Sequence, residues 1–376
     1  NREAVIIDAL FGSGLSKPIE GIYRDAVEWI NKQPNNVVAI DIPSGLPGEA
    51  CMSVADCVVG ADFTYSLQFP KLSFLLPENE KFVGKWNLID IQLHPKGIEK
   101  TETGMIYLDK TDIQQVLKAR SRFSNKGNFG HTLIWAGKKG MAGAAVLVSK
   151  AALRSGAGLV SVHSDEMNRI ILQTTAPEAI FKTELDNIEA YNAFAFGPGL
   201  GTDSHTTEMF TELLKSLPGP CVLDADALNI IALQPHLIDY IPVDSVLTPH
   251  PKEFERLFGK SVNSLERIRL AREKSRELNV VIVLKGANTL IATPDGKLYF
   301  NSTGNPGMAS GGMGDVLTGI IAGLMAQGYS SADSSILGVY LHGLSADQAL
   351  FYQSEESLLA SDVIAQLGSA FKLLRT

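Results

Sequence analysis

The sequence has little of what a nucleic-acid-binding or membrane protein needs. Its 376 residues carry 33 lysines and arginines against 41 aspartates and glutamates, a formal net charge of −8. Binding to nucleic acid or to an anionic membrane requires a concentrated basic surface, which this balance disfavours. No run of residues approaches the roughly 18–20 apolar positions of a membrane span. We therefore expect a small-molecule substrate and neither a nucleic-acid nor a membrane partner.

Cysteine is scarce, and an initiator methionine is absent. Cys51, Cys57 and Cys221 cannot all pair, and their spacing matches neither a zinc site nor a redox pair. Packed thiols in a reducing compartment are the simplest interpretation, so we expect a cytoplasmic protein. The chain begins at Asn1, just before an apolar run at Ala4–Asp8. This start indicates a cut N-terminus and leaves an upstream targeting segment open.

The length and the 45% hydrophobic content are sufficient for two or three domains with buried cores. Residues 4–90 alternate short apolar runs with turns, which is typical of parallel βαβ units, and residues 4–8 are expected to form a buried strand. A polar stretch at 94–103 is the best candidate linker. We predict two domains, residues 1–98 and residues 104–376.

The second domain restarts the strand–turn–helix pattern at Thr132. Its apolar runs do not alternate with polar residues, which favours a mostly parallel α/β sheet with helices on both faces. Ligands of such sheets bind at the carboxyl ends of the strands. The predicted strands are 132–136, 159–163, 193–196, 221–224, 245–248, 280–285 and 289–293, and the helices include 144–155 and 316–328.

The most informative segment is the glycine-rich run Gly304–Asp315. Its glycines allow positive φ and close approach to a ligand, and the following helix points its free N–H groups into the turn. Asp315 could be a carboxylate in the first turn of this helix that only interacts favourably with the helix dipole. The dense glycines before it instead favour a general base or acid that acts on a hydroxyl that is being phosphorylated. Gly312, Met313 and Gly314 would offer N–H groups to the phosphoryl oxygens.

Other polar loops follow the predicted strands, and two of them stay ambiguous. Lys285–Thr289 fits either a nucleotide contact or a plain β-turn. Asp224 and Asp226 fit a water-mediated magnesium site, although Asp226 could instead cap the following helix. His250 lies between two prolines that restrict its flanks, which favours a binding role. Together with the glycine-rich loops 137–144 and 197–201, these segments predict one site at one edge of the sheet.

The first domain also has polar turns after its strands. Asp8 and Ser44 offer hard oxygen ligands for a small cation, and Gly12–Gly14 could pass close to a phosphate. Ordinary turn-forming residues would explain the same pattern.

In their order along the chain, these motifs resemble the bifunctional NAD(P)H-hydrate repair enzymes. That family joins an epimerase domain to an ADP-dependent, in some members ATP-dependent, NAD(P)H-hydrate dehydratase domain. The resemblance implies that residues 1–98 are the C-terminal half of a Rossmann-like epimerase domain and that residues 104–376 are a ribokinase-like dehydratase domain. It rests on segments 126–131, 140–145, 197–201, 224–229, 248–253, 285–289 and, above all, 304–315.

For the dehydratase, the resemblance implies phosphorylation of the C6 hydroxyl of (6S)-NADHX or NADPHX by ADP or ATP with Mg²⁺. Elimination of phosphate then restores NADH or NADPH, because phosphate leaves far more readily than hydroxide. Asp315 would be the catalytic residue. The nucleotide would contact Lys285, Gly286, Ala287, Asn288, Thr289 and Gly314, and the hydrate would contact Ala144, Gly199, His250 and Asp315.

For the epimerase, the resemblance implies K⁺ binding by Asp8 and Ser44. The hydrate would contact Gly12, Ser13, Gly14, Leu15, Ser16, Lys17, Pro18 and Asp41. Ser13 and Lys17 replace the commoner threonine and arginine. The family's upstream Asn/Gly-rich motif has no counterpart here, so we expect epimerisation only if the domain is complete. A homo-oligomer of four or more subunits is also implied.

Two other functions fit parts of the pattern. A ribokinase-like small-molecule kinase would share the glycine-rich turn and Asp315 but would stop at a phosphorylated product. A non-catalytic dinucleotide-binding module would keep the loops without chemistry. The Asn305–Met308 start of the turn and the attached epimerase-like domain favour the dehydratase. The sequence leaves open the choices between ADP and ATP and between NADHX and NADPHX.

Overall fold

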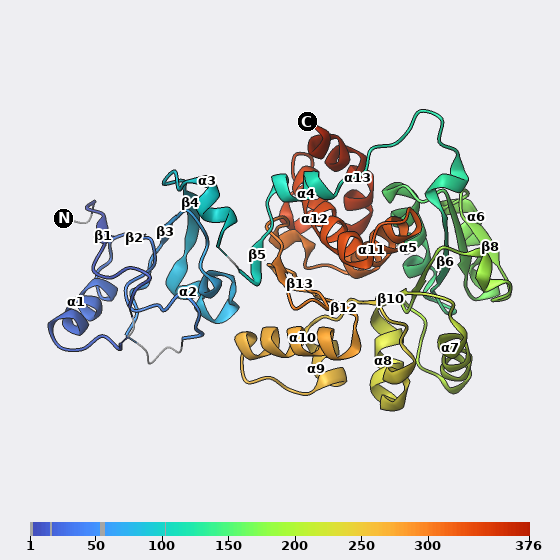
Figure 1. Cartoon of the computed structure of the whole chain (residues 1–376), viewed down its shortest axis with the longest axis horizontal. Coiled ribbons are helices and arrows are strands. Elements are labelled where there is room, and N and C mark those ends of the chain that lie inside the picture. Colours follow the sequence, from blue (N-terminus) through green and yellow to red (C-terminus); the bar gives the residue numbers. More distant parts are fainter. Residues whose placement is uncertain (1–2, 16, 53–56, 102) are drawn as a thin grey trace. The chain divides into compact units, whose positions relative to one another are not determined.

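The computed structural model describes residues 3–15, 17–52, 57–101 and 103–376, and the chain forms two compact units (Figure 1). One unit comprises residues 1–103 with Ser261–Arg269, and the other comprises residues 104–260 with Leu270–Thr376. Among the described residues, no helix combines the length and apolar character needed to cross a membrane.

The first unit contains a four-stranded, fully parallel sheet. Its order is β1 (Ile6–Asp8), β2 (Val37–Ile40), β3 (Phe63–Leu67) and β4 (Lys85–Ile89). Helix α1 (Ile22–Asn31) buries one face, through Val27 and Ile30, in the core that contains Val37 and Ala39. Because β1 and β2 are parallel, the loops that follow them lie at the same edge of the sheet. Two short helices, α2 (Glu80–Val83) and α3 (Pro95–Glu99), complete the unit.

The expectation of a buried strand at residues 4–8 is wrong for part of that run. The strand begins at Ile6, and Val5 and Ile7 are 54% and 66% exposed. The reason is topological, because β1 is an edge strand that pairs only with β2 in the described sheet. Asp8, at its carboxyl end, is nevertheless buried.

The second unit is built on a ten-stranded sheet that is parallel except at β13. This strand pairs antiparallel with both β12 and β14. In spatial order the strands are β5 (Met105–Tyr107), β14 (Leu298–Phe300), β13 (Leu290–Ala292), β12 (Val281–Leu284), β11 (Val246–Leu247), β10 (Cys221–Leu223), β9 (Ala193–Phe196), β6 (His131–Trp135), β7 (Leu159–His163) and β8 (Ile180–Lys182).

Helices cover both faces of this sheet (Figure 1). One layer contains α4 (Lys110–Val116), α5 (Ala142–Ser155), α11 (Met313–Ala326), α12 (Ser331–Ala349) and α13 (Ala360–Arg375). The other contains α7 (Ser204–Ser216), α8 (Ala225–Leu233), α9 (Pro251–Phe258) and α10 (Ser264–Leu278), while α6 (Arg169–Thr175) lies beside β8. The predicted α/β class, with a mostly parallel sheet between helical layers, is confirmed.

Helix α11 lies unusually close to α5. A Cβ at Gly319 would lie 2.3 Å from the carbonyl oxygen of Val148, and one at Gly323 would lie 2.2 Å from Oγ of Ser155. These two glycines are one helical turn apart and face α5, so only a residue without a side chain fits at either position. These contacts fix the position of α11 against α5.

Candidate active site

The glycine-rich run forms a turn that leads directly into α11. Gly304 and Gly312 have φ of 107° and 89°, which favour glycine. Helix α11 begins at Met313, three residues earlier than the predicted 316, so Asp315 lies in its first turn. No side chain caps this end, and the first N–H groups of a helix have no intrahelical partner. The turn therefore presents free N–H groups and a positive dipole end to an anion.

Asp315 is only partly accessible, and its pKa is raised to about 7. Burial is the main cause; the negative charge of Asp224 adds to it, and the positive charge of Lys285 opposes it. No hydrogen bond to the Asp315 carboxylate comes from the described residues. A carboxylate that is uncommitted and titrates near neutral pH is suited to act as a general base.

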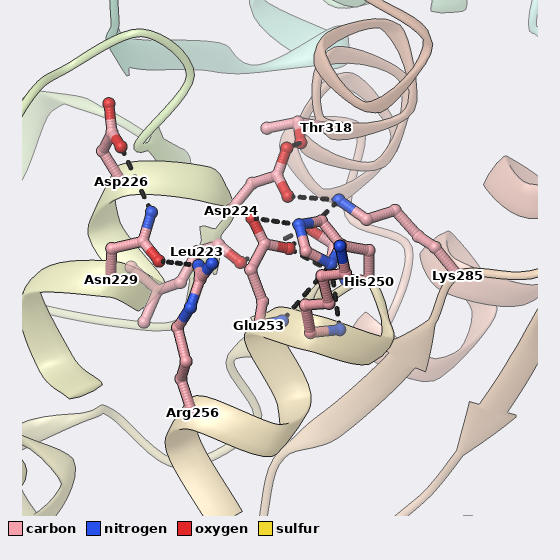
Figure 2. A network of polar contacts seen from close by, with 11 residues as sticks. Leu223, Asp224, Asp226, Asn229, His250, Glu253, Arg256, Lys285 and Thr318 are labelled. Atoms are coloured by element: carbon pink, nitrogen blue, oxygen red, sulfur yellow. Dashed lines mark hydrogen bonds and ion pairs between the residues drawn. The ribbon is translucent and has the colours of Figure 1, made fainter. Parts of the chain in front are cut away.

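The two charged neighbours of Asp315 form a buried ion pair with each other. Figure 2 shows this pair, Lys285 and Asp224. Nζ of Lys285 donates to Oδ1 of Asp224 at 2.7 Å, and the hydroxyl of Thr318 donates to Oδ2 at 2.8 Å. Asp224 is 1% exposed, and burial alone would raise its pKa, but Lys285 reverses that effect and the net pKa is lowered. Burial likewise opposes the charge of Lys285, yet Asp224 and Glu253 raise its pKa overall. Both partners are therefore charged.

This ion pair lies against helix α11 at Gly314. A Cβ on Gly314 would lie 3.4 Å from Nζ of Lys285 and 3.6 Å from Oδ2 of Asp224. The ammonium group is thus held against the second residue of α11. The geometry fits the expected nucleotide contacts of Lys285 and Gly314. The loop that continues from Lys285 to Thr289 forms a turn. A 3.0 Å hydrogen bond from the Thr289 hydroxyl to the Gly286 carbonyl closes this turn, and Ala287 and Asn288 lie between these two residues.

The two carboxylates considered for magnesium have separate protein partners. Asp224 is committed to Lys285 and Thr318. Asp226 accepts the Gly201 N–H at 2.7 Å and the Asn229 amide at 3.2 Å. Among the described residues, no group of three or more His, Cys, Asp or Glu side chains could hold a metal ion. The alternative role of Asp226 as a helix cap is wrong, because Asp224 is the N-cap of α8 and no side chain caps this helix.

His250 is the N-cap of α9, and the first turn of that helix holds its side chain in place. Its Nδ1 accepts N–H groups of Lys252 at 3.1 Å and Glu253 at 3.3 Å, while Oε2 of Glu253 accepts the His250 N–H at 2.8 Å. Partial burial is the main cause of a lowered pKa for His250, with Lys285 contributing. Its ring is therefore neutral near pH 7, and 43% of its side chain remains exposed to contact a ligand.

Two glycine-rich loops meet at the positions expected to bind the hydrate. A Cβ on Gly199 would lie 3.0 Å from Cβ of Met141 and 3.1 Å from Cβ of Ala144. The Lys138 N–H also donates to the Gly199 carbonyl at 2.6 Å. Ala144 and Gly199 are thus direct neighbours at the carboxyl ends of β6 and β9. His250 lies in the loop after β11 at the same edge of the sheet. Contacts that run from Glu253 through Lys285 and Asp224 to Thr318 connect this loop with α11.

The first unit brings the two expected cation ligands together. The Ser44 hydroxyl lies 2.6 Å from Oδ1 of Asp8, and the Ser44 N–H donates to Oδ2 at 2.7 Å. The carbonyl oxygen of Phe11 lies 3.3 Å from the same hydroxyl. Asp8 and Ser44 are each 1% exposed. No lysine or arginine among the described residues forms an ion pair with Asp8, so this buried carboxylate fits a monovalent cation held by oxygen ligands.

Asp41 lies beside the expected hydrate-binding loop and has a basic partner. It has φ of 69°, and its Oδ2 accepts the Ser13 N–H at 3.3 Å. Lys71 Nζ lies 2.5 Å from Oδ1. Partial burial raises the pKa of Asp41, but Lys71 outweighs it, so the pKa is lowered. A Cβ at Gly12 would lie 3.5 Å from Oδ2.

The rest of the expected hydrate-binding loop is open. Gly14, Lys17 and Pro18 are exposed, and Leu15 packs at the edge of the core. Ser16 lies outside the described residues.

Sequence reasoning missed three residues of these sites. Thr318 is a fully buried polar residue in an apolar helix, and this exception to the pattern could have identified it. Glu253 follows His250 by three residues, the spacing of a capping box. Lys71 contacts Asp41 across 30 residues, and no local spacing predicts that contact.

The fold and the site define a nucleotide-dependent enzyme of the ribokinase-like α/β class. A glycine turn and helix N-terminus for phosphate, a buried lysine and an unpaired aspartate converge at the carboxyl ends of the strands. The model of the NAD(P)H-hydrate dehydratase family matches residues 132–367, and that of the YjeF-related protein N-terminus matches residues 1–73. The chain belongs to the family of bifunctional NAD(P)H-hydrate repair enzymes, as its motifs predicted.

Similar proteins cover both units. The bifunctional NAD(P)H-hydrate repair enzyme of Vibrio cholerae is 37% identical, with 96% of this chain and 74% of that protein aligned. The corresponding protein of Moorella thermoacetica is 34% identical, with 96% and 71% aligned. The ADP/ATP-dependent NAD(P)H-hydrate dehydratase of Bacillus subtilis, crystallised with ATP and Mg²⁺, is 32% identical. It has a TM-score of 0.64 and covers 72% of this chain and 98% of its own.

Proposed function

We propose that this protein repairs hydrated nicotinamide cofactors by dehydrating (6S)-NADHX or NADPHX to NADH or NADPH. The reaction is driven by ADP, which yields AMP and phosphate, or by ATP in the same role. The observation that carries the proposal is the combination of an uncommitted Asp315, with a pKa of about 7, and the Lys285 ammonium at the head of α11.

In this mechanism Asp315 takes the proton of the C6 hydroxyl. The hydroxyl oxygen then forms a bond to the terminal phosphorus of the nucleotide, and the bond from that phosphorus to the bridging oxygen breaks. The positive charge of Lys285 and the free N–H groups of α11 stabilise the charge on the phosphoryl oxygens. The bond from C6 to the phosphorylated oxygen then breaks and phosphate leaves, while C5 loses a proton, so that the C5–C6 double bond of the reduced nicotinamide ring is restored.

Magnesium fits the site as a companion of the nucleotide. Mg²⁺ usually binds through phosphates, waters and one or two carboxylates rather than in an all-protein cage. Asp226 is the suitable carboxylate, because Asp224 is already neutralised by Lys285. When bound, Mg²⁺ would neutralise charge on the nucleotide phosphates.

The first unit supports a second proposed activity, epimerisation of the R and S hydrates. K⁺ would be held by Asp8, Ser44 and the Phe11 carbonyl, and Asp41 with Lys71 would face the hydrate. Where the epimerase domain is complete, wild type is expected to interconvert (6R)- and (6S)-NADHX, and Asp41→Asn is expected to lose this activity. Equal rates for the two proteins would contradict this assignment.

The dehydratase proposal is tested by mixing the protein with Mg²⁺, (6S)-NADHX and either ADP or ATP. Recovery of the nicotinamide absorbance of NADH with at least one nucleotide is expected. No recovery with either would overturn the proposal. A stable phosphorylated product from a vitamin or sugar would favour the kinase alternative. Sedimentation of the same preparation tests the proposed homo-oligomer of four or more subunits.

A further inference from the structure

A basic pocket lies in the second unit, away from the active site. It has a volume of about 630 Å³, within the range of small-molecule sites. It is formed by the loop 117–124, the segment before β6, and the C-terminal ends of α5, α11 and α13. Helix α11 has 14 residues, so its two ends are about 20 Å apart. Since the phosphate-binding turn is at the opposite end of α11, the pocket is a separate site.

Four cationic side chains line this pocket, Lys118, Arg120, Arg154 and Arg375. No aspartate or glutamate is among the lining residues in the described part of the chain. None of the four forms an ion pair with a described carboxylate. Such a concentration of unpaired positive charge is unexpected in a chain with a net charge of −8, where acidic residues outnumber basic ones.

The negative C-terminal ends of nearby helices neutralise part of this positive charge but not all of it. Nζ of Lys118 donates to the Gly328 carbonyl at 2.6 Å, and Arg120 donates to the Gly156 carbonyl at 2.6 Å. These carbonyls follow α11 and α5. Each helix C-terminus carries roughly −0.5 charge, so three of them offset about 1.5 of the four positive charges. A surplus of about 2.5 positive charges remains, and burial together with the charge of Arg375 lowers the pKa of Arg120.

Aromatic rings lie among these cations. The Arg120 guanidinium is 3.8 Å from the centroid of the Phe129 ring, and Lys118 Nζ is 4.3 Å from that of Tyr329. The two cations are thereby held in place on rings. Phe123 in the same loop is 91% exposed and offers a free face for stacking. Fixed positive charges beside aromatic faces match a phosphate group attached to a planar base.

We propose that this pocket is a second binding site, which takes a small phosphorylated metabolite such as a nucleotide. Its phosphate would neutralise the surplus charge of Arg154 and Arg375, and an aromatic base would stack in the loop 117–124. The site lies outside the catalytic machinery, so it does not depend on the reaction proposed above.

The test is the number of ligands bound per chain, measured by calorimetric titration with AMP and, separately, with inorganic pyrophosphate. The pocket variant is Arg154→Ala/Arg375→Ala. The matched control is Arg122→Ala/Lys372→Ala, which removes two exposed positive charges from loop 117–124 and α13 without touching the pocket lining. Sedimentation of each protein reports its oligomeric state.

We expect the pocket variant to bind one AMP fewer per chain than wild type, while the control binds the same number. Loss of pyrophosphate binding in parallel shows that the phosphate is recognised, and tighter binding of AMP shows that the base contributes. Unchanged ligand numbers in the pocket variant would overturn the proposal. A variant that changes oligomeric state without losing a ligand would also overturn it, since the pocket would then be a contact between copies of this chain.

Discussion

At the scale of single residues, the site depends on one carboxylate that is kept protonatable and another that is kept ionised. Asp315 has a pKa raised to about 7, whereas Asp224, only 1% exposed, has a lowered pKa because Lys285 neutralises it. The difference arises from the neighbours of each group, since both are buried to a large extent. Asp224 therefore acts as a positioning residue that fixes Lys285 and raises the pKa of Asp315.

The pH dependence of dehydration follows from this arrangement. Asp315 acts as a base only when ionised, so kcat/KM is expected to rise with pH and level off above about pH 7. Asp224→Asn removes a negative neighbour and frees Lys285, and both effects lower the pKa of Asp315. In a plot of kcat/KM against pH, measured from about pH 5 to about pH 9, the rise on the acid side should therefore move to lower pH. The exposed Asp239→Asn serves as control, and a limb that stays in place or moves upward would refute the role of Asp224.

The ionised form of Asp315 should also lower the free energy of unfolding of the protein. Its folded-state pKa is raised above the unfolded value of 3.8, so the folded state binds the proton more tightly and the cost develops as pH rises from about 4 to about 7. Asp315→Asn is expected to increase the free energy of unfolding at about pH 8 by about 1–2 kcal/mol, after allowance for partial solvent screening. At about pH 4 the two proteins should be equally stable. Denaturant unfolding at both pH values measures this, and destabilisation at the higher pH would contradict the electrostatic account.

At the scale of elements, the position of the site depends on how closely α11 approaches α5. Gly319→Ala would place a methyl group 2.3 Å from the Val148 carbonyl and is expected to destabilise the protein by about 1–3 kcal/mol. The control is Gly368→Ala in α13, where nothing lies within 4 Å of the added carbon. That change should stabilise by about 0.5–1 kcal/mol, because alanine favours a helix interior. Thermal unfolding of both variants provides the measurement, and equal effects would show that the close contact is not limiting.

The sequence predicts the buried strands better than the edge strands. The apolar run 193–196 is a strand with those same bounds, because burial on both faces leaves an unbroken hydrophobic signal. Edge strands such as β4 and β8 contain lysines and exposed positions, which weakens that signal. Within the site, Asp315 and Lys285 can be found from local motifs. The hydrogen bond between Thr318 and Asp224 joins residues 94 apart, so only the folded chain reveals it.

At the scale of the whole molecule, the two units have separate hydrophobic cores, and we propose a different ligand for each. The core of the first unit includes Val27 and Ala39, and that of the second includes Val148 and Ile320. A ligand that binds only folded protein raises the unfolding temperature of the unit that contains its site. We expect calorimetry to show that Mg²⁺–ADP shifts one thermal transition and that KCl, compared with NaCl, shifts another. Asp8→Asn should abolish the KCl effect alone. A shift of both transitions by either ligand would contradict this division.

In the proposed reaction, Asp315 and Lys285 use a nucleotide to convert the C6 hydroxyl into a phosphate leaving group. Product balance tests it most directly, through simultaneous measurement of AMP, phosphate and NADH formed from ADP and (6S)-NADHX by wild type and by Asp315→Asn. We expect equal amounts of all three products from wild type, and no turnover from the variant although it still binds ADP. Accumulation of a phosphorylated hydrate without NADH, or an undiminished rate in Asp315→Asn, would contradict the account.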